Sequence, residues 1–155
     1  MAPDTDHEVV VRPACDEDVV AMVGLLAVGS LVEGKEDRRD LAPYRAALVE
    51  IAQGPGGVLV AEHKGVVVGL CQVIVFRHLQ SRGALCAEIE SVHVHPEMRG
   101  QGIGHVLMRC AIERARELGC SRVQLTSNMA RPDAHRFYES LGFVPSHLGF
   151  KLALR

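Results

Sequence analysis

The stretch 95-HPEMRGQGIGHVLM-108 contains three glycines within the six residues RGQGIG. A strand-like pattern precedes it and ends at Pro96, which cannot donate to a sheet, and an apolar pattern of helical spacing follows it. Glycine weakens regular structure, so such a cluster indicates that the backbone must make a close approach. At a strand-to-helix junction the free N–H groups and the helix dipole favour an anion. The stretch therefore predicts a phosphate-binding turn.

The elements around this turn decide the fold class. The strand 85–95 leads into it and the helix 103–119 leaves it. Strands are also predicted at 8–14, 58–63, 66–76, 122–128, 143–146 and 149–154, and helices at 16–27, 40–52 and 134–141. Consecutive antiparallel strands that precede a strand–helix–strand unit predict an α/β (α+β) fold with a mixed sheet.

The composition narrows the class of protein. The chain has 155 residues, 48% of them apolar and 23% charged, which predicts one domain over residues 1–155 with a flexible tail at 1–7. No apolar run is long enough to span a membrane, and the polar N-terminus is unlike a signal peptide, so we expect a cytoplasmic protein. A net charge of −2 with dispersed arginines gives no support for a nucleic-acid partner. Without a CxxC pair or an HExxH motif, no metal site is predicted.

Two known phosphate-binding motifs can be excluded at this turn. The dinucleotide pattern GxGxxG fails because its third glycine would fall on His105, and no Walker sequence is present. What remains is Arg99-x-x-Gly102-x-Gly104, which resembles the pyrophosphate motif of the Gcn5-related N-acetyltransferase (GNAT) family. The segment 128-NMARPDAHRFYESLGF-143 is similar to a second signature of that family.

The resemblance extends from about Val9 to Leu154 and implies a fold, a cosubstrate and a set of binding residues. The implied fold is a central, mixed but mostly antiparallel sheet of six to seven strands flanked by about four helices. The implied cosubstrate is acetyl-CoA. The implied cofactor-binding residues are Val92, His93, Val94, Arg99, Gly100, Gln101, Gly102, Ile103, Gly104, Asn128 and His135. By the same resemblance, a β-bulge in the strand 85–95 opens the cleft.

Acetyl transfer to an amine needs a base, a polarised thioester and an acid for the leaving thiolate. Glu88 and Glu90 alternate along their strand and so share one face, which we expect to include Val92 and Val94. Glu88 is the first choice as base and Glu90 the second, and at least one of the two is expected to be a structural carboxylate. By resemblance Tyr138 is the acid, with a core tyrosine as the alternative.

The acceptor is predicted to be a small primary amine. The C-terminal third is most similar to aminoalkylphosphonate N-acetyltransferases, through 133-DAHRFY-138 and 149-GFKLAL-154. Two alternatives stay open: a protein lysine or N-terminal acetyltransferase, and a non-catalytic acyl-CoA-binding sensor. The resemblance also leaves a homodimer, paired through the last strands, as an option.

Overall fold

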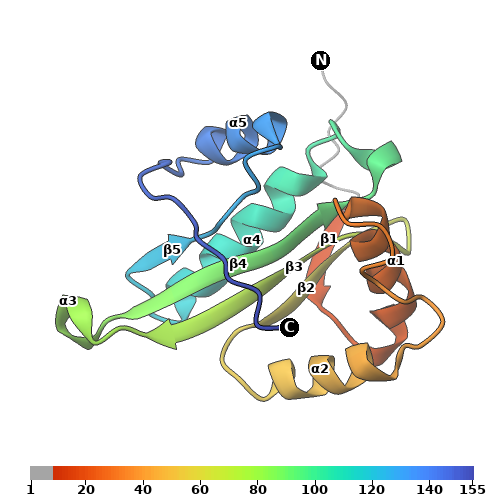
Figure 1. The fold of residues 1–155 in the computed structure, drawn as a ribbon, viewed down its shortest axis with the longest axis horizontal. Coiled ribbons are helices and arrows are strands. Elements are labelled where there is room, and N and C mark those ends of the chain that lie inside the picture. The colour runs from red at the N-terminus through yellow and green to blue at the C-terminus, as the bar shows by residue number, and fades with distance from the viewer. Residues whose placement is uncertain (1–8) are drawn as a thin grey trace.

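A five-stranded mixed sheet organises the computed structural model, which describes residues 9–155 (Figure 1). The strands lie in sequence order: β1 (Val9–Pro13), β2 (Gly57–His63), β3 (Val66–Arg77), β4 (Leu85–Val94) and β5 (Arg122–Gln124). The first four pair antiparallel, and β5 pairs parallel to β4. The α+β class with a mixed, mostly antiparallel sheet is thus confirmed. The predicted tail at 1–7 lies outside the described residues.

Helices cover both faces of the sheet, and one short helix lies in the turn between β3 and β4 at the end of the sheet (Figure 1). They are α1 (Val19–Gly29), α2 (Ala42–Ala52), the short α3 (Gln80–Gly83), α4 (Ile103–Glu117) and α5 (Pro132–Ser140), with 3-10 turns at Asp16–Asp18 and Pro96–Met98. On β2, Val60 packs with the residues of α1, whereas the next residue, Ala61, packs with those of α4. Because neighbouring strand residues point to opposite faces, α1 and α4 cover opposite faces of the sheet. No helix within residues 9–155 is long and apolar enough to cross a bilayer.

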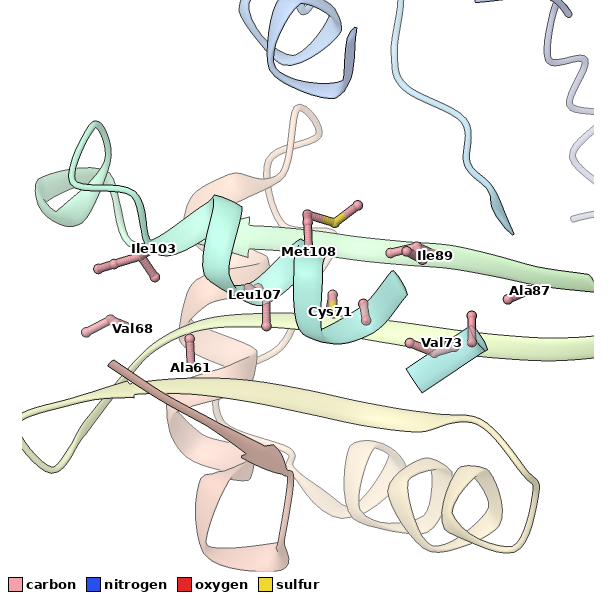
Figure 2. Close-up of a cluster of buried hydrophobic side chains, with 11 residues drawn as sticks. Ala61, Val68, Cys71, Val73, Ala87, Ile89, Ile103, Leu107 and Met108 are labelled. Atoms are coloured by element: carbon pink, nitrogen blue, oxygen red, sulfur yellow. The ribbon is translucent and has the colours of Figure 1, made fainter. Parts of the chain in front are cut away.

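The larger core lies between α4 and the central strands (Figure 2). Ile103, Leu107, Ala111 and Ala115 recur every four residues along α4, and each is at most 2% exposed. This spacing gives α4 one continuous apolar stripe. The stripe meets Cys71 and Val73 of β3, and Ala87 and Ile89 of β4. The contacts of this stripe with β3 and β4 therefore hold the helix that follows the glycine turn in place along its whole length.

A β-bulge interrupts β4. Leu70 pairs with His93 and Gln72 pairs with Glu90, so Cys71 alone lies opposite both Ser91 and Val92. Ser91 has φ +54°, a left-handed conformation that is uncommon for serine. The bulge implied by the family resemblance is confirmed.

The sheet is smaller than expected. The predicted strands at 143–146 and 149–154 do not form, so the described sheet has five strands instead of six or seven. Leu148, Phe150, Leu152 and Leu154 alternate as a strand would, but each is at least 76% exposed. β5 ends at Gln124 and offers no neighbouring ladder along which this segment could pair. Within the expected turn 77–84, the structure has the short helix α3, in which Ser81 and Arg82 are left-handed.

Candidate active site

The bulge decides which side chains share a face. Val92 and Val94 pack against the α4 core, as Ile89 does. Glu90 lies opposite Gln72, one residue from the α4-facing Cys71, and therefore faces the α1 side of the sheet. The expectation that Glu88 and Glu90 share a face with Val92 and Val94 was wrong, because the extra residue at Ser91 reverses the alternation.

Glu88 and Glu90 form a carboxylate pair on the α1 side. The Gln124 side-chain amide donates a hydrogen bond to Glu88 Oε2 at 3.0 Å. Burial raises the pKa of Glu90, and a hydrogen bond with Glu88 and the charge of Glu88 raise it further. The ammonium of Lys151 acts in the opposite direction. A carboxylate whose pKa is raised toward neutrality is a stronger base than an ordinary glutamate.

The two carboxylates differ in their position along the strand. The pairing between β4 and β5 ends at Glu88 and Gln124. Glu90 lies beyond this point, where β4 still pairs with β3 but no longer with β5, and it is next to the bulge. The space between the separated strands is therefore adjacent to Glu90, whereas Glu88 is held at the last paired position.

Tyr138 of α5 is partly buried among aromatic rings. Its ring centroid lies 5.2 Å from that of Phe137 and 6.1 Å from that of Phe143, both in edge-to-face arrangements. Burial raises the pKa of Tyr138, with smaller effects from Cys71, Arg131 and Glu90. The hydroxyl is therefore protonated at neutral pH and lies close enough to Glu90 for the charge of Glu90 to act on it.

The glycine turn presents open backbone. Gly100 and Gly102 have φ of +75° and +82°, and a Cβ added at either position would meet no atom within 4 Å. The first N–H of α4 that finds a backbone acceptor in the described chain belongs to Val106, which donates to Gly102 O at 3.1 Å. Ile103 contributes its N–H to this free first turn while its side chain is buried. Unpaired donors facing open space fit an anionic pyrophosphate.

The third glycine has another cause. A Cβ at Gly104 would lie 3.2 Å from Phe137 Cζ, so this glycine lets α4 approach α5. The Arg99 side chain turns back, and its Nε donates to Val94 O at 3.1 Å. The Gln101 amide donates to Glu97 O at 3.3 Å.

The loop before α5 is organised by hydrogen bonds to Asn128. The Asn128 side-chain oxygen accepts from Ala130 N at 2.9 Å, a typical turn contact. His135 Nε2 lies 2.9 Å from Asn128 O and connects the loop to α5. Neither contact uses the side-chain NH₂ of Asn128, which donates to no acceptor within residues 9–155.

His93 lies at the end of α1. A Cβ at Gly29 would come within 2.0 Å of His93 Nδ1, so only glycine leaves room for this ring. Burial lowers the pKa of His93, and the nearby charges of Arg131 and Arg99 lower it further. Arg131 also donates to Gly29 O, which connects the loop before α5 to α1. His93 is therefore a neutral imidazole at neutral pH.

A cavity of about 400 Å³ lies between α2 and the sheet on the α1 side. Gln72 and Ile74, the cross-strand partners of Glu90 and Glu88, form its strand wall, and Ile51 lines its helix wall. A second cavity of about 430 Å³ lies between β2 and the C-terminal half of α4, and none of the predicted site residues lines either cavity. Within residues 9–155, no three His, Cys, Asp or Glu side chains are placed together as metal ligands.

The fold and this arrangement define the class of protein. Residues 28–143 match the acetyltransferase (GNAT) family, so the chain belongs to that family. An aminoalkylphosphonate N-acetyltransferase of Salmonella typhimurium is 40% identical over 94 residues, which are 61% of this chain and 60% of that protein. A mycothiol acetyltransferase of Thermobispora bispora is 38% identical over 92 residues, 58% of this chain but 30% of that protein. The matched stretches thus span less than two thirds of these relatives.

Solved structures of similar shape cover the chain more fully. A protein of Bacillus halodurans C-125, described as a transcriptional regulator, has a TM-score of 0.89 and 40% identity, covering 94% of this chain and 99% of that one. A putative acetyltransferase of Agrobacterium tumefaciens has a TM-score of 0.83 and 28% identity, covering 93% and 99%.

Four residues near the site were missed in the sequence. Ser91 creates the bulge, Gln124 holds Glu88, Arg131 contacts α1, and Lys151 acts on Glu90. No motif indicated the first three. Lys151 falls in the predicted strand 149–154, and its position near Glu90 depends on how that segment crosses the sheet.

Proposed function

We propose that this chain is an acetyl-CoA-dependent N-acetyltransferase whose acceptor is a small primary amine. The observation that carries the proposal is the position of Glu90, a half-buried carboxylate beside the bulge, within electrostatic reach of the Tyr138 hydroxyl. Membership of the family and the open glycine turn support it.

The proposed roles follow from these positions. Acetyl-CoA, when bound, supplies an activated acetyl group. The free N–H groups from Gly102 to Gly104 hold its pyrophosphate. The other residues proposed to bind acetyl-CoA are Arg99, Gly100, Gln101, Asn128 and His135. Glu90 takes the proton that an acceptor ammonium must lose, because its raised pKa suits it as a base near neutral pH. Tyr138, protonated and partly buried, supplies the proton to the leaving thiolate.

Glu88 is proposed to support Glu90. Its bond to Gln124 fixes its carboxylate at the last paired position of β4 and β5. From there Glu88 raises the pKa of Glu90 through a hydrogen bond and through charge. The proposed base is thus Glu90, whereas the sequence made Glu88 the first choice and Glu90 the second.

The acceptor class is supported by the cavity on the α1 side of the sheet, which is the face that carries the two carboxylates. A volume of about 400 Å³ suits a small molecule. The name of the Salmonella typhimurium relative makes aminoalkylphosphonates the first compounds to test. A lysine peptide represents the protein-acetylating alternative.

The test measures free thiol released from acetyl-CoA with aminoalkylphosphonates, amino acids, polyamines, aminoglycosides and a lysine peptide. We expect turnover on one small-amine class, and a fall of roughly 10²- to 10⁴-fold for Glu90→Gln and for Tyr138→Phe. Glu117→Gln, an exposed change on α4, is the matched control and should keep full activity. Glu88→Gln should reduce activity less than Glu90→Gln does.

Two outcomes would contradict the proposal. Turnover on the lysine peptide alone would support a protein acetyltransferase. Binding of acetyl-CoA without turnover on any amine would support a sensor, a role in line with the description of the Bacillus halodurans protein. Isothermal titration with acetyl-CoA separates the second outcome from a failure to bind.

A homodimer is proposed as the working state. The residues Leu148, Phe150, Leu152 and Leu154 expose an alternating apolar row that has no partner strand within the described chain. Pairing with a second copy would bury these side chains. Light scattering after gel filtration should give twice the mass of the chain, and Phe150→Ser with Leu152→Ser should return it to a single copy.

A further inference from the structure

The segment 143–155 passes over the sheet close to the carboxylate pair. A Cβ at Gly149 would lie 3.3 Å from Thr126 Cγ2, which places Gly149 just past the end of β5. In Figure 1 the dark blue trace then crosses in front of β4. Lys151 follows two residues later, and its ammonium is close enough to Glu90 to favour the charged carboxylate. The segment therefore carries the primary amine of Lys151 across β4, within electrostatic reach of Glu90.

Lysine is rare in this chain. The sequence has three lysines, Lys35, Lys64 and Lys151, and of these it is Lys151 whose charge acts on Glu90. Lys151 is exposed and lies outside any helix or strand. A tethered group of this kind has an effective concentration in the millimolar range, so it competes with free acceptors.

We infer that Lys151 is a site of self-acetylation, modified by the active site of its own chain in the absence of a better acceptor. The inference rests on the proposed acetyltransferase function and adds an internal acceptor to it. The geometry behind it is the contact of Gly149 with Thr126, two residues before Lys151, and the crossing of segment 143–155 over β4, the strand that carries Glu90 (Figure 1).

The step balances as an ordinary acetyl transfer. The Lys151 ammonium gives one proton to Glu90, which passes it to water. The freed Nζ forms a bond to the acetyl carbon of acetyl-CoA, and the bond between that carbon and sulfur breaks. The second Nζ proton is lost as the amide forms, and the departing thiolate gains a proton from Tyr138, which solvent restores. The products are acetyl-Lys151, CoA thiol and one proton.

The first experiment incubates the protein with acetyl-CoA and no amine, and then maps acetyl groups by mass spectrometry. We expect Lys151 to be acetylated roughly tenfold or more faster than Lys35 or Lys64. Lys151→Arg should lose this acetylation, Lys64→Arg should keep it, and Glu90→Gln should slow it. The rate per chain should not change with protein concentration, and Lys151→Arg chains mixed with Glu90→Gln chains should not recover the wild-type rate, because the amine and the base belong to one molecule.

Each other result has a definite meaning. Equal acetylation of the three lysines would indicate reaction in solution and overturn the inference. A rate per chain that rises with protein concentration would overturn it in favour of transfer between chains. Turnover on a small amine without acetylation of Lys151 would overturn it and leave the proposed function intact. If neither Lys151 nor any small amine is acetylated, the inference and the proposed function are both overturned.

A second measurement tests the geometry without acetyl-CoA. The pKa of Glu90 is followed by NMR in the wild type, in Lys151→Met and in Lys64→Met. Because the Lys151 charge favours ionised Glu90, Lys151→Met should raise the pKa of Glu90 and Lys64→Met should not. An unchanged Glu90 pKa in Lys151→Met would overturn the placement on which the inference depends.

Discussion

Gly102 allows the phosphate-binding role of the glycine turn to be tested apart from its role in stability. Gly102→Ala forces a residue with a side chain to φ +82°, which costs about 1–2 kcal/mol. The new Cβ meets no atom within 4 Å, so no packing cost adds to this strain. The expected fall in melting temperature is about 2–8 °C for a chain of this size.

Gly102→Ala should also weaken the binding of acetyl-CoA, independently of its effect on stability. The Cβ would stand in the open space that the first turn of α4 faces, where the pyrophosphate is proposed to lie. A hydrogen bond from an N–H to a charged group is worth about 1.5–3 kcal/mol. Losing one such bond predicts a dissociation constant roughly ten- to a hundredfold higher, measured by isothermal titration.

Gly119 provides the matched control. It follows the other end of α4, has the same φ of +82°, and a Cβ there also meets no atom within 4 Å. Gly119→Ala should therefore lower the melting temperature by a similar amount and leave acetyl-CoA affinity unchanged. If both variants bind acetyl-CoA as the wild type does, the assignment of the glycine turn is wrong.

Three further predictions concern the base, the core and the ion pair beneath α1. The acid limb of kcat/KM against pH should lie above the range of an ordinary glutamate, because activity needs ionised Glu90 and burial raises its pKa, and Lys151→Met should move the limb higher still. Leu107→Ala removes a fully buried side chain from α4 and should cost about 2.7–5 kcal/mol in urea unfolding, with a loss below 1 kcal/mol contradicting the packing described. Asp18 is bound at 2.7 Å by Arg12, which holds the pKa of Asp18 at about 2. This stabilisation is present above about pH 4 and lost as pH falls through about 2, so Asp18→Asn should destabilise the protein by about 2 kcal/mol at neutral pH, and a difference that persists at about pH 2 would refute this account.

The elements with strong local patterns were predictable from the sequence. The apolar residues of α4 repeat at helical spacing, and Gly119 follows its end, so the helix needed no information from distant residues. The segment 149–154 also has a clear local pattern, but a strand exists only where a neighbour supplies its hydrogen bonds. Its alternation is that of a strand, but the strand predicted there does not form, because β5 ends too early to pair with it.

The site was predictable in its residue types and less so in its geometry. Glu88, Glu90 and Tyr138 were selected by spacing and resemblance, and the structure brings Glu90 and Tyr138 within electrostatic reach of each other. The face of Val92 was predicted wrongly, because a serine in a left-handed conformation has no sequence signature. The electrostatic effect of Lys151 on Glu90 joins residues far apart in the chain, which periodicity does not address.

The bulge at Ser91 affects how this chain is compared with its relatives. One inserted residue reverses the orientation of every side chain after it. The residues of β4 that face the α4 side are therefore the odd-numbered ones before the bulge and the even-numbered ones after it. An alignment that slips by one position near Ser91 would match the residues after the bulge to neighbours that point to the opposite face. Transfer of a residue's role between relatives is therefore sound on this strand when the bulge, and not the nearest glutamate, is used as the fixed point.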